Sequence, residues 1–341
     1  MIDRDFLDHP HDKMFRTLFS DPVLAAGFLK DFLAPSISAA CDWDQLKIVP
    51  GSLIDPELSK QECDCLYEVP MAGAPLNVYL LFEHQSTVDG WMALRLMMYM
   101  TRIWQKVLKE NPSGPFKLPP VLPIVLYQAA DKWTAAIEFS ALFDVANAGM
   151  APFLPKFEYA LFDLGNTDPN EIPGPPPVQM VLRVMRAVYQ DPMKYLKALE
   201  SEVGSIDIAI NEGSQEQLAT ALLTYIFGVN RAVSFEDLQG TLATGRSKRT
   251  RSKIMSIAET LIRKGEKQGL EQGLEQGLEQ GLERGRQATR RAIMRNLLRR
   301  FGSEAEAVRA AVEAVTDLDS LEELRDDALT ASLTDLKAKL G

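Results

Sequence analysis

The chain has 341 residues, of which 46% are hydrophobic and 25% charged, and its formal net charge is −10 at pH 7. This length exceeds one ordinary compact core, so we expect two or three units. The acidic balance argues against a protein that coats nucleic acid uniformly, and no stretch approaches the roughly 18 uninterrupted apolar residues of a membrane span. The composition is typical of a soluble globular protein, and we expect no bilayer crossing.

Cysteine usage and the N-terminus indicate a reducing compartment. Only Cys41, Cys63 and Cys65 are present, too few for a disulfide framework or a four-thiolate zinc site. The chain begins MIDRDFLDHPHDK, with acids where a signal peptide needs basic residues followed by an apolar stretch. We therefore expect a cytoplasmic protein.

The first half of the chain predicts an α/β domain over residues 1–170. Apolar residues recur at helical spacing over 12–33, and Asp21-Pro22 supplies an N-cap and a first-turn proline, so a broken helix is expected there. The further elements follow in chain order: strands at 46–49, 62–69 and 77–83, a buried helix at 91–109, and strands at 121–127 and near 157–164. The predicted order is helix, three strands, helix and strand.

A proline-rich segment, IPGPPP at 172–177, is predicted to end this domain, because proline lacks the N–H that a sheet or helix needs. Amphipathic patterns near 178–189 and 215–227 then predict a helical subdomain over 178–244. A basic arm and a repeat helix follow over 245–288, and a C-terminal helical segment over 289–341 completes the chain.

Positive charge is concentrated in one segment. Residues 245–301 contain 15 lysines and arginines against 6 glutamates, a local charge of +9, which leaves −19 for the rest of the chain. The arm GRSKRTRSK contains Lys248, Arg249, Arg251 and Lys253, and we predict that these residues contact DNA phosphates. Later arginines are expected to assist: Arg290, Arg291, Arg295, Arg299 and Arg300. The alternative is a solvated linker.

The unit QGLE occurs four times over residues 268–283. Each glycine costs about 1 kcal/mol in a helix relative to alanine, so an isolated helix of this sequence needs compensation. Close helix contact along a Gly/Leu stripe would provide it and would make a homodimer. A spacer of variable length, made by recent duplication, is the other interpretation, and both stay open.

The residues with the strongest chemical signal lie on two neighbouring predicted strands. Glu83 and Gln85, two apart, share one face, and Asp64 on the preceding strand can converge on them. Two close carboxylates are typical of a site for Mg²⁺ or Mn²⁺, which would activate water against a phosphodiester. Gln85 would hold that water or donate to phosphate, and Glu62 is a candidate accessory acid. One or two ions fit equally well.

These residues lie in runs that resemble a known family: HDKMFRTLFSDP, CDCLYEV, LLFEHQSTVDGWMALRLMMYM and PPVLPIVLYQAADKW. Over roughly residues 9–230 the chain resembles the Rpn, or YhgA-like, family of recombination-promoting nucleases and putative transposases. The resemblance implies a restriction-endonuclease-like PD-(D/E)XK core and a DNA endonuclease acting in recombination or mobile-element-like processing.

Carried over to this chain, the metal-binding acids of the family fall on Asp64 and Glu83, and its third motif residue falls on Gln85. Most enzymes of the wider superfamily have lysine at this third position. This fold often uses a further acid from the first helix, for which Asp12 is the nearest candidate. The resemblance leaves open whether DNA is only cut or also joined.

A competing hypothesis is a catalytically weak or inactive DNA-binding or oligomeric protein that retains the fold. Gln85 in place of lysine and the acidic body favour it. Arg95, one helical turn before Tyr99, either contacts DNA phosphate or connects its helix to the sheet, and the sequence favours neither. Cys65 and His84 alternate with the acids and are predicted to be core residues.

Overall fold

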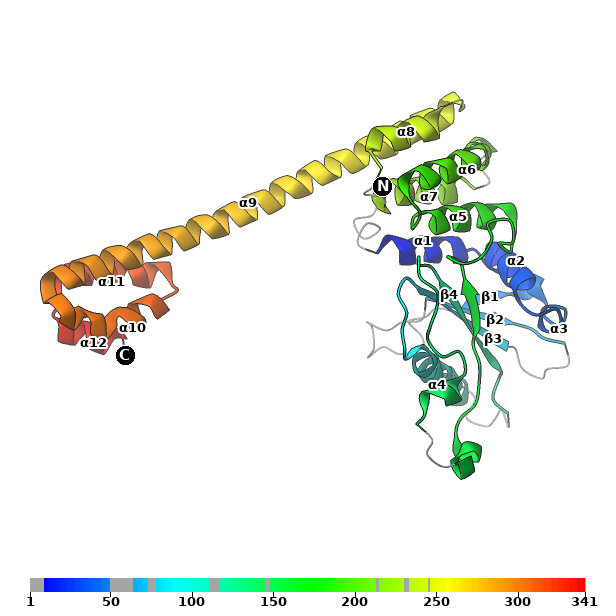
Figure 1. Cartoon of the computed structure of the whole chain (residues 1–341), viewed down its shortest axis with the longest axis horizontal. Coiled ribbons are helices and arrows are strands. Elements are labelled where there is room, and N and C mark those ends of the chain that lie inside the picture. The colour runs from blue at the N-terminus through cyan, green and yellow to red at the C-terminus, as the bar shows by residue number, and fades with distance from the viewer. Residues whose placement is uncertain are drawn as a thin grey trace. The chain divides into compact units, whose positions relative to one another are not determined.

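A mixed five-stranded sheet organises the first of the two units of the computed structural model, Met1–Leu261, whereas the second unit, Ile262–Gly341, is helical (Figure 1). The structure describes residues 9–49, 64–72, 78–110, 117–144, 148–212, 215–229, 233–244 and 246–340. Residues 62 and 63, at the predicted start of one strand, lie outside this description.

The sheet has the strand order β1-β2-β3-β4-β5. Its strands are β1 (Lys47–Val49), β2 (Cys65–Val69), β3 (Val78–Gln85), β4 (Val121–Tyr127) and β5 (Ala160–Asp163). The first three strands pair antiparallel, and β3, β4 and β5 run parallel. The apolar run predicted at 121–127 forms strand β4, and both of its faces are buried: Ile124 and Leu126 belong to one hydrophobic cluster and Val125 to another, which explains why the run lacks polar alternation.

Helices account for most of the remaining structure of the first unit. They are α1 (Pro10–Phe19), α2 (Pro22–Phe32), α3 (Pro35–Ser38), α4 (Met92–Glu110), α5 (Pro176–Ala187), α6 (Pro192–Glu212), α7 (Glu216–Val229), α8 (Phe235–Ala243) and the start of α9 (Lys248–Phe301). Short 3-10 turns lie at Trp43–Gln45, Phe139–Leu142 and Ala148–Phe153. The predicted N-cap is present, because the Asp21 carboxylate accepts from the N–H groups of Val23 and Leu24. None of the helices in the described ranges combines the length and the apolar character needed to cross a bilayer.

The sheet has a different helical layer on each face. On one face, α1, α2 and α5 pack against a core that contains four clustered phenylalanines, Phe15, Phe19, Phe28 and Phe82. Ring contacts of this kind bury large apolar areas and are a major source of stability. On the other face, α4 packs against the side chains of alternate strand residues, including Leu66 and Leu81.

The helices predicted over 178–244 share one core with the sheet. The proline-rich segment does not separate two cores: Ile172, its first residue, and Val178, directly after it, belong to the same hydrophobic cluster as Phe82. Within it, Gly174 adopts a φ of +99°, which glycine tolerates, and its N–H donates to the Asp31 carboxylate. The segment therefore turns the chain from β5 into α5, and it leaves the helices able to contact the strands.

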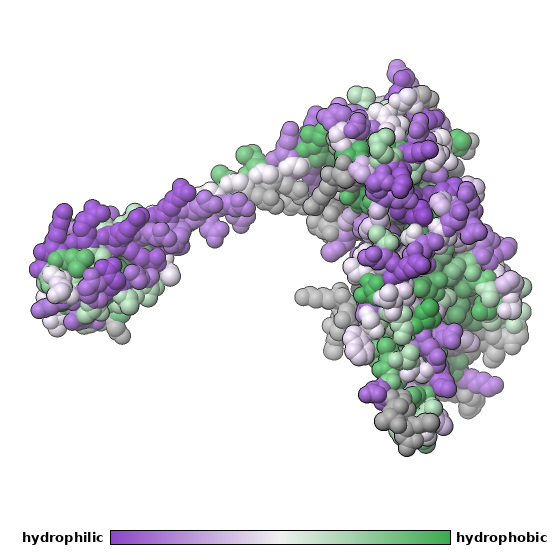
Figure 2. All heavy atoms as spheres, viewed as in Figure 1, coloured by the Kyte–Doolittle hydropathy of each residue, from purple (hydrophilic) through white to green (hydrophobic). Residues whose placement is uncertain are grey.

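The second unit has a core of its own. The C-terminal part of α9 packs against Gly302–Val308, α10 (Arg309–Ala314), α11 (Leu318–Thr330) and α12 (Leu333–Leu340). Hydrophilic residues cover most of its visible face (Figure 2). Arg290 donates to the Val315 carbonyl and Arg300 to the Ala328 carbonyl, so these two predicted DNA contacts have structural roles in the fold.

Candidate active site

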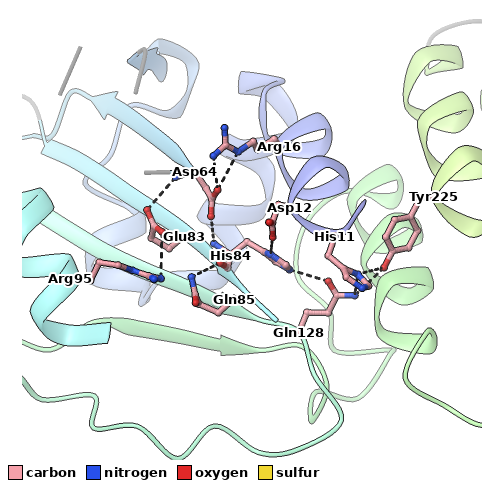
Figure 3. A network of polar contacts seen from close by, with 10 residues as sticks. All are labelled: His11, Asp12, Arg16, Asp64, Glu83, His84, Gln85, Arg95, Gln128 and Tyr225. Carbon is pink, nitrogen blue, oxygen red and sulfur yellow. Dashed lines mark hydrogen bonds and ion pairs between the residues drawn. The ribbon is translucent and has the colours of Figure 1, made fainter. Parts of the chain in front are cut away.

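Asp64 and Glu83 meet at the margin of the sheet. The antiparallel pairing of Cys65 with Phe82 places Asp64, immediately before β2, opposite Glu83 on β3. The Asp64 backbone N–H donates to Glu83 Oε1 at 3.2 Å, and the two side chains come from the same edge of neighbouring strands (Figure 3). The convergence expected from strand alternation is therefore present in the structure.

Glu83 is an acid in an unfavourable environment for its charge. Its residue surface is only 3% exposed. Burial, together with the neighbouring Asp64 carboxylate, raises the pKa of Glu83 to about 8, although the Arg95 guanidinium opposes the rise. A buried carboxyl group next to a second one favours an added positive charge.

Arg16 supplies part of that charge, and the sequence did not single it out. Its Nε and Nη2 donate to Asp64 Oδ1 at 3.2 and 3.1 Å, and its side chain is 47% exposed. Arg16 lies on α1, 48 residues before Asp64. No local pattern connects two residues so far apart, so only the packing of α1 on the sheet identifies the contact.

Arg95, on α4, lies beside Glu83 and also pairs with Asp89. Its guanidinium lies 3.2 Å from Asp89 and 3.9 Å from Glu83 Oε2. Of the two roles left open for Arg95, the structure shows the intramolecular one. The neighbouring Tyr99 is buried in the core beneath α4. A contact between Arg95 and DNA phosphate stays a prediction.

Gln85 lies at the end of β3, beside the carboxylates. Its side-chain Nε2 donates to the backbone carbonyl of His84 at 2.6 Å. The backbone carbonyl of Gln85 accepts from the backbone N–H of Gln128. The backbone N–H of His84 donates to Asp64 Oδ2 at 2.8 Å. The segment Glu83–Gln85 therefore presents a carboxylate, a carbonyl and an amide to the same edge.

His84 projects to the opposite face of the sheet, as alternation predicts, and its side chain is fully buried. Its Nδ1 lies 2.8 Å from Asp12 Oδ1, and its Nε2 lies 3.0 Å from Gln128 Oε1. The structure thus places Asp12 on the ring of His84, and this hydrogen bond lowers the pKa of the Asp12 carboxyl. The role of Asp12 as a further acid of the site stays a prediction.

Gln128 connects His84 to the helices. Its Nε2 donates to the Met185 carbonyl at 2.8 Å and to the Tyr225 hydroxyl at 3.1 Å, which leaves Oε1 as the acceptor that faces His84. Each ring nitrogen of His84 therefore has one side-chain oxygen as its partner, from Asp12 on one side and from Gln128 on the other. The Tyr225 hydroxyl also forms a hydrogen bond with His11 Nδ1 at 2.8 Å. Burial lowers the pKa of His11 to about 4, so this second ring is neutral.

A hard divalent cation at this site would receive two carboxylate ligands from the protein. Other oxygen atoms would complete its coordination shell. In the ranges that the structure describes, no group of three or more His, Cys, Asp or Glu side chains could hold a metal ion. Asp64 and Glu83 provide two adjacent carboxylates, and the Gln85 amide and the His84 carbonyl lie at the same edge. Cations such as Mg²⁺ are bound in proteins by one or two carboxylates together with water.

Glu62 and the basic arm are the remaining residues that the sequence predicted to act at the site or on DNA. Glu62, the candidate accessory acid, lies outside the described residues, as does Cys63. The predicted basic arm is the first part of α9. Arg249 and Lys253 both pair with Glu216 at 2.8 Å, whereas Lys248 and Arg251 are exposed and line a surface groove.

Comparison with known proteins gives relatives over most of the chain. The model of one family, described as "Putative transposase, YhgA-like", matches residues 9–216. Recombination-promoting nuclease RpnD of Escherichia coli O157:H7 is 27% identical over 255 residues, which are 74% of this chain and 94% of that protein. Recombination-promoting nuclease RpnA of Escherichia coli K12 is 27% identical over 259 residues, 76% of this chain and 85% of that protein. The inactive recombination-promoting nuclease-like protein RpnE of the same strain is 31% identical over 118 residues, 35% of this chain and 38% of that protein. No solved structure matches.

Proposed function

Because this chain belongs to the YhgA-like family of putative transposases, we propose that it is a metal-dependent DNA endonuclease acting in recombination or mobile-element-like DNA processing. The names of RpnD and RpnA support a nuclease. The observation that carries the proposal is the contact between Asp64 and Glu83, two acids on neighbouring strands. We further propose that the mixed sheet is a PD-(D/E)XK core, since its elements follow the order helix, three strands, helix and strand.

In this proposal Asp64 and Glu83 hold Mg²⁺ or Mn²⁺ at the edge of the sheet. A bound ion of this type polarises the scissile phosphate and lowers the pKa of water, which makes hydrolysis feasible at neutral pH. Gln85 orients the attacking water or donates to a phosphate oxygen, because an amide can do both but cannot act as a strong base. The positive charge of Arg95 opposes the rise in the pKa of Glu83 and so favours the ionised form that binds a cation.

The second candidate function is a DNA-binding or oligomeric protein with a weak or inactive site. Two observations favour it: Gln85 replaces the lysine usual in the wider superfamily, and one relative, RpnE, is named as inactive. The two candidates differ in one measurable property, which is cleavage that depends on both the metal and the two acids.

The direct test is incubation of purified protein with supercoiled plasmid, with Mg²⁺, with Mn²⁺ and with EDTA. We expect nicking only with a metal, and a loss of at least about 100-fold in Asp64→Ala and Glu83→Ala. The exposed Glu200→Ala on α6 is the matched control and should cleave like the wild type. Nicking that persists in both site variants would refute the assignment, and a wild type inactive with every metal would favour the second candidate.

For DNA contact we propose Lys248 and Arg251, because they are exposed while Arg249 and Lys253 are paired with Glu216. Each phosphate contact adds about 0.9 to the slope of log affinity against log salt. The double variant Lys248→Gln/Arg251→Gln should therefore bind a DNA duplex about 10-fold more weakly and with a slope shallower by about 2, measured by fluorescence anisotropy. An unchanged slope would show that the arm is a solvated linker.

We also propose that α9 makes a homodimer through its repeats. Leu270, Leu274, Leu278 and Leu282 are 74%, 74%, 65% and 41% exposed, and the intervening glycines have open space around their Cα atoms. Replacing the four leucines by glutamine keeps the length of the helix and should halve the mass per particle in multi-angle light scattering. A wild-type monomer, or a variant that remains dimeric, would leave the repeat as a spacer.

A further inference from the structure

We propose that Gln128 is a positioning residue for the nuclease site, which ties helices α5 and α7 to the Asp64 carboxylate through His84. This inference rests on the proposed nuclease function, and it adds residues that no sequence pattern selected. It also assigns a task to the helices of residues 178–244, which the sequence predicted only as a subdomain.

The first observation is that Gln128 is completely buried and fully engaged. It directly follows β4, and its backbone N–H donates to the Gln85 carbonyl. Its side-chain amide donates to the Met185 carbonyl and to Tyr225, and its Oε1 faces His84. A buried amide without partners costs free energy, so a fully partnered one is held in a single orientation.

The second observation is a continuous path of hydrogen bonds from Gln128 to the site. His84 is held on one ring nitrogen by Gln128 and on the other by Asp12, and its backbone N–H donates to Asp64 Oδ2 at 2.8 Å (Figure 3). Because both ring nitrogens are held, the ring contacts anchor the His84 backbone, and with it this N–H, to the far side of the sheet. The peptide group that orients Asp64 is therefore set from the far side of the sheet.

The third observation is that the site needs such a constraint. Asp64 and Glu83 lie opposite each other on neighbouring strands, with the Asp64 N–H 3.2 Å from Glu83 Oε1, so their two carboxylates repel each other when no cation lies between them. Repelling groups hold a common position only where surrounding donors impose it, and the described donors to Asp64 are the His84 N–H and Arg16. Half-exposed Arg16 is a flexible donor, whereas the His84 N–H belongs to a paired strand.

The fourth observation is the distance in sequence over which the path extends. Tyr225 on α7 contacts Gln128, 97 residues earlier, and also forms a hydrogen bond with His11 on α1. Met185 on α5 contributes a backbone carbonyl. Both helices follow all the strands in the chain, so the position of Asp64 depends on segments outside the sheet.

Two variants test the path at different points, and one matched control lies beside them. Gln128→Met removes the amide at nearly constant volume, and Tyr225→Phe removes one hydroxyl. Thr224→Val is the control, because this buried threonine, adjacent to Tyr225 on the same helix, donates only within α7, to the Thr220 carbonyl. Each protein is measured in two ways: amide hydrogen exchange without metal, and plasmid cleavage with Mg²⁺.

We expect hydrogen exchange in the peptide over residues 78–85 to rise about 10-fold more than in α6 for Gln128→Met, and by a smaller factor for Tyr225→Phe. In cleavage, kcat should fall about 10-fold with KM within about twofold of the wild type. Thr224→Val should change neither quantity. Equal acceleration throughout the first unit, or none in β3, would overturn the proposal by showing a general effect on stability. If the wild type does not cleave DNA, the function proposal fails while the exchange experiment still decides the positioning role.

Discussion

Replacing Glu83 by glutamine should abolish cleavage and, at the same time, stabilise the metal-free protein. Both effects have one cause, which is the buried carboxyl group held next to Asp64. As a metal ligand the carboxylate is needed for activity, so we expect at least about a 100-fold loss of plasmid nicking. As a charge without its cation it is repelled by its neighbour, and the neutral amide removes that repulsion.

The stabilisation should depend on pH with a defined sign. The folded-state pKa of Glu83, about 8, lies above its ordinary value of 4.5, so its stabilising contribution is complete below pH 4.5 and is lost as the pH rises through 8. Glutamine does not titrate. The free energy of unfolding of Glu83→Gln minus that of the wild type should therefore grow from pH 5 to pH 8.5, reaching on the order of 1 to 3 kcal/mol.

Urea unfolding in EDTA at pH 5, 7 and 8.5 measures this difference. The same substitution at Glu200, which is exposed on α6, should show no such growth and should leave cleavage unchanged. A difference between Glu83→Gln and wild type that is constant with pH would show that burial and the Asp64 carboxylate do not raise the pKa of Glu83 in the folded state. Retention of cleavage within about threefold would remove Glu83 from the proposed metal site.

The carboxylate pair was within reach of sequence reasoning because it depends on short-range geometry. Strand alternation places Glu83 and Gln85 on one face, and a single antiparallel pairing brings Asp64 beside them. Both strands are recognisable from their apolar residues and their turn signals. The element order of the sheet domain follows from the same patterns, since each pattern acts over fewer than about 20 residues.

The charged and polar partners of the site could not be found in this way. Arg16 reaches Asp64 only because α1 packs on the sheet, and Tyr225 reaches Gln128 only because α7 packs on α1. Periodicity shows which face of a helix is buried, but it does not show which element covers that face. A buried glutamine after an apolar strand is a signal that can be recognised, because such an amide requires partners.

Helix α6 was not predicted as an element of its own although its pattern was present. The buried residues of α6 recur every three or four positions, at Tyr195, Leu199, Val203, Ile206 and Ile210. This spacing is typical of an amphipathic helix. By contrast, the prediction that the proline-rich segment ends a domain relied on local backbone chemistry alone. Proline stops an element, but tertiary packing decides whether a core ends with it.

Gly165→Ala should destabilise the first unit by about 3 kcal/mol or more, among the larger effects of a single substitution. A Cβ atom built on Gly165 would lie 2.0 Å from the carbonyl oxygen of Ala129. Both positions follow parallel strands, β5 and β4, and the obstructing atom belongs to the backbone, which cannot rotate away as a side chain would. One of the two segments must therefore move.

The movement has a consequence for the site as well. Ala129 is bonded directly to Gln128, so a shift of its carbonyl displaces the amide that faces His84. Gly165→Ala should thus lower both the free energy of unfolding in urea and kcat. Gly204→Ala on α6 is the matched control: its Cβ meets nothing within 4 Å, and alanine should stabilise that helix by up to about 1 kcal/mol. A loss below about 1 kcal/mol at Gly165 would mean that the ends of β4 and β5 adjust easily, and that their spacing does not hold Gln128 in place.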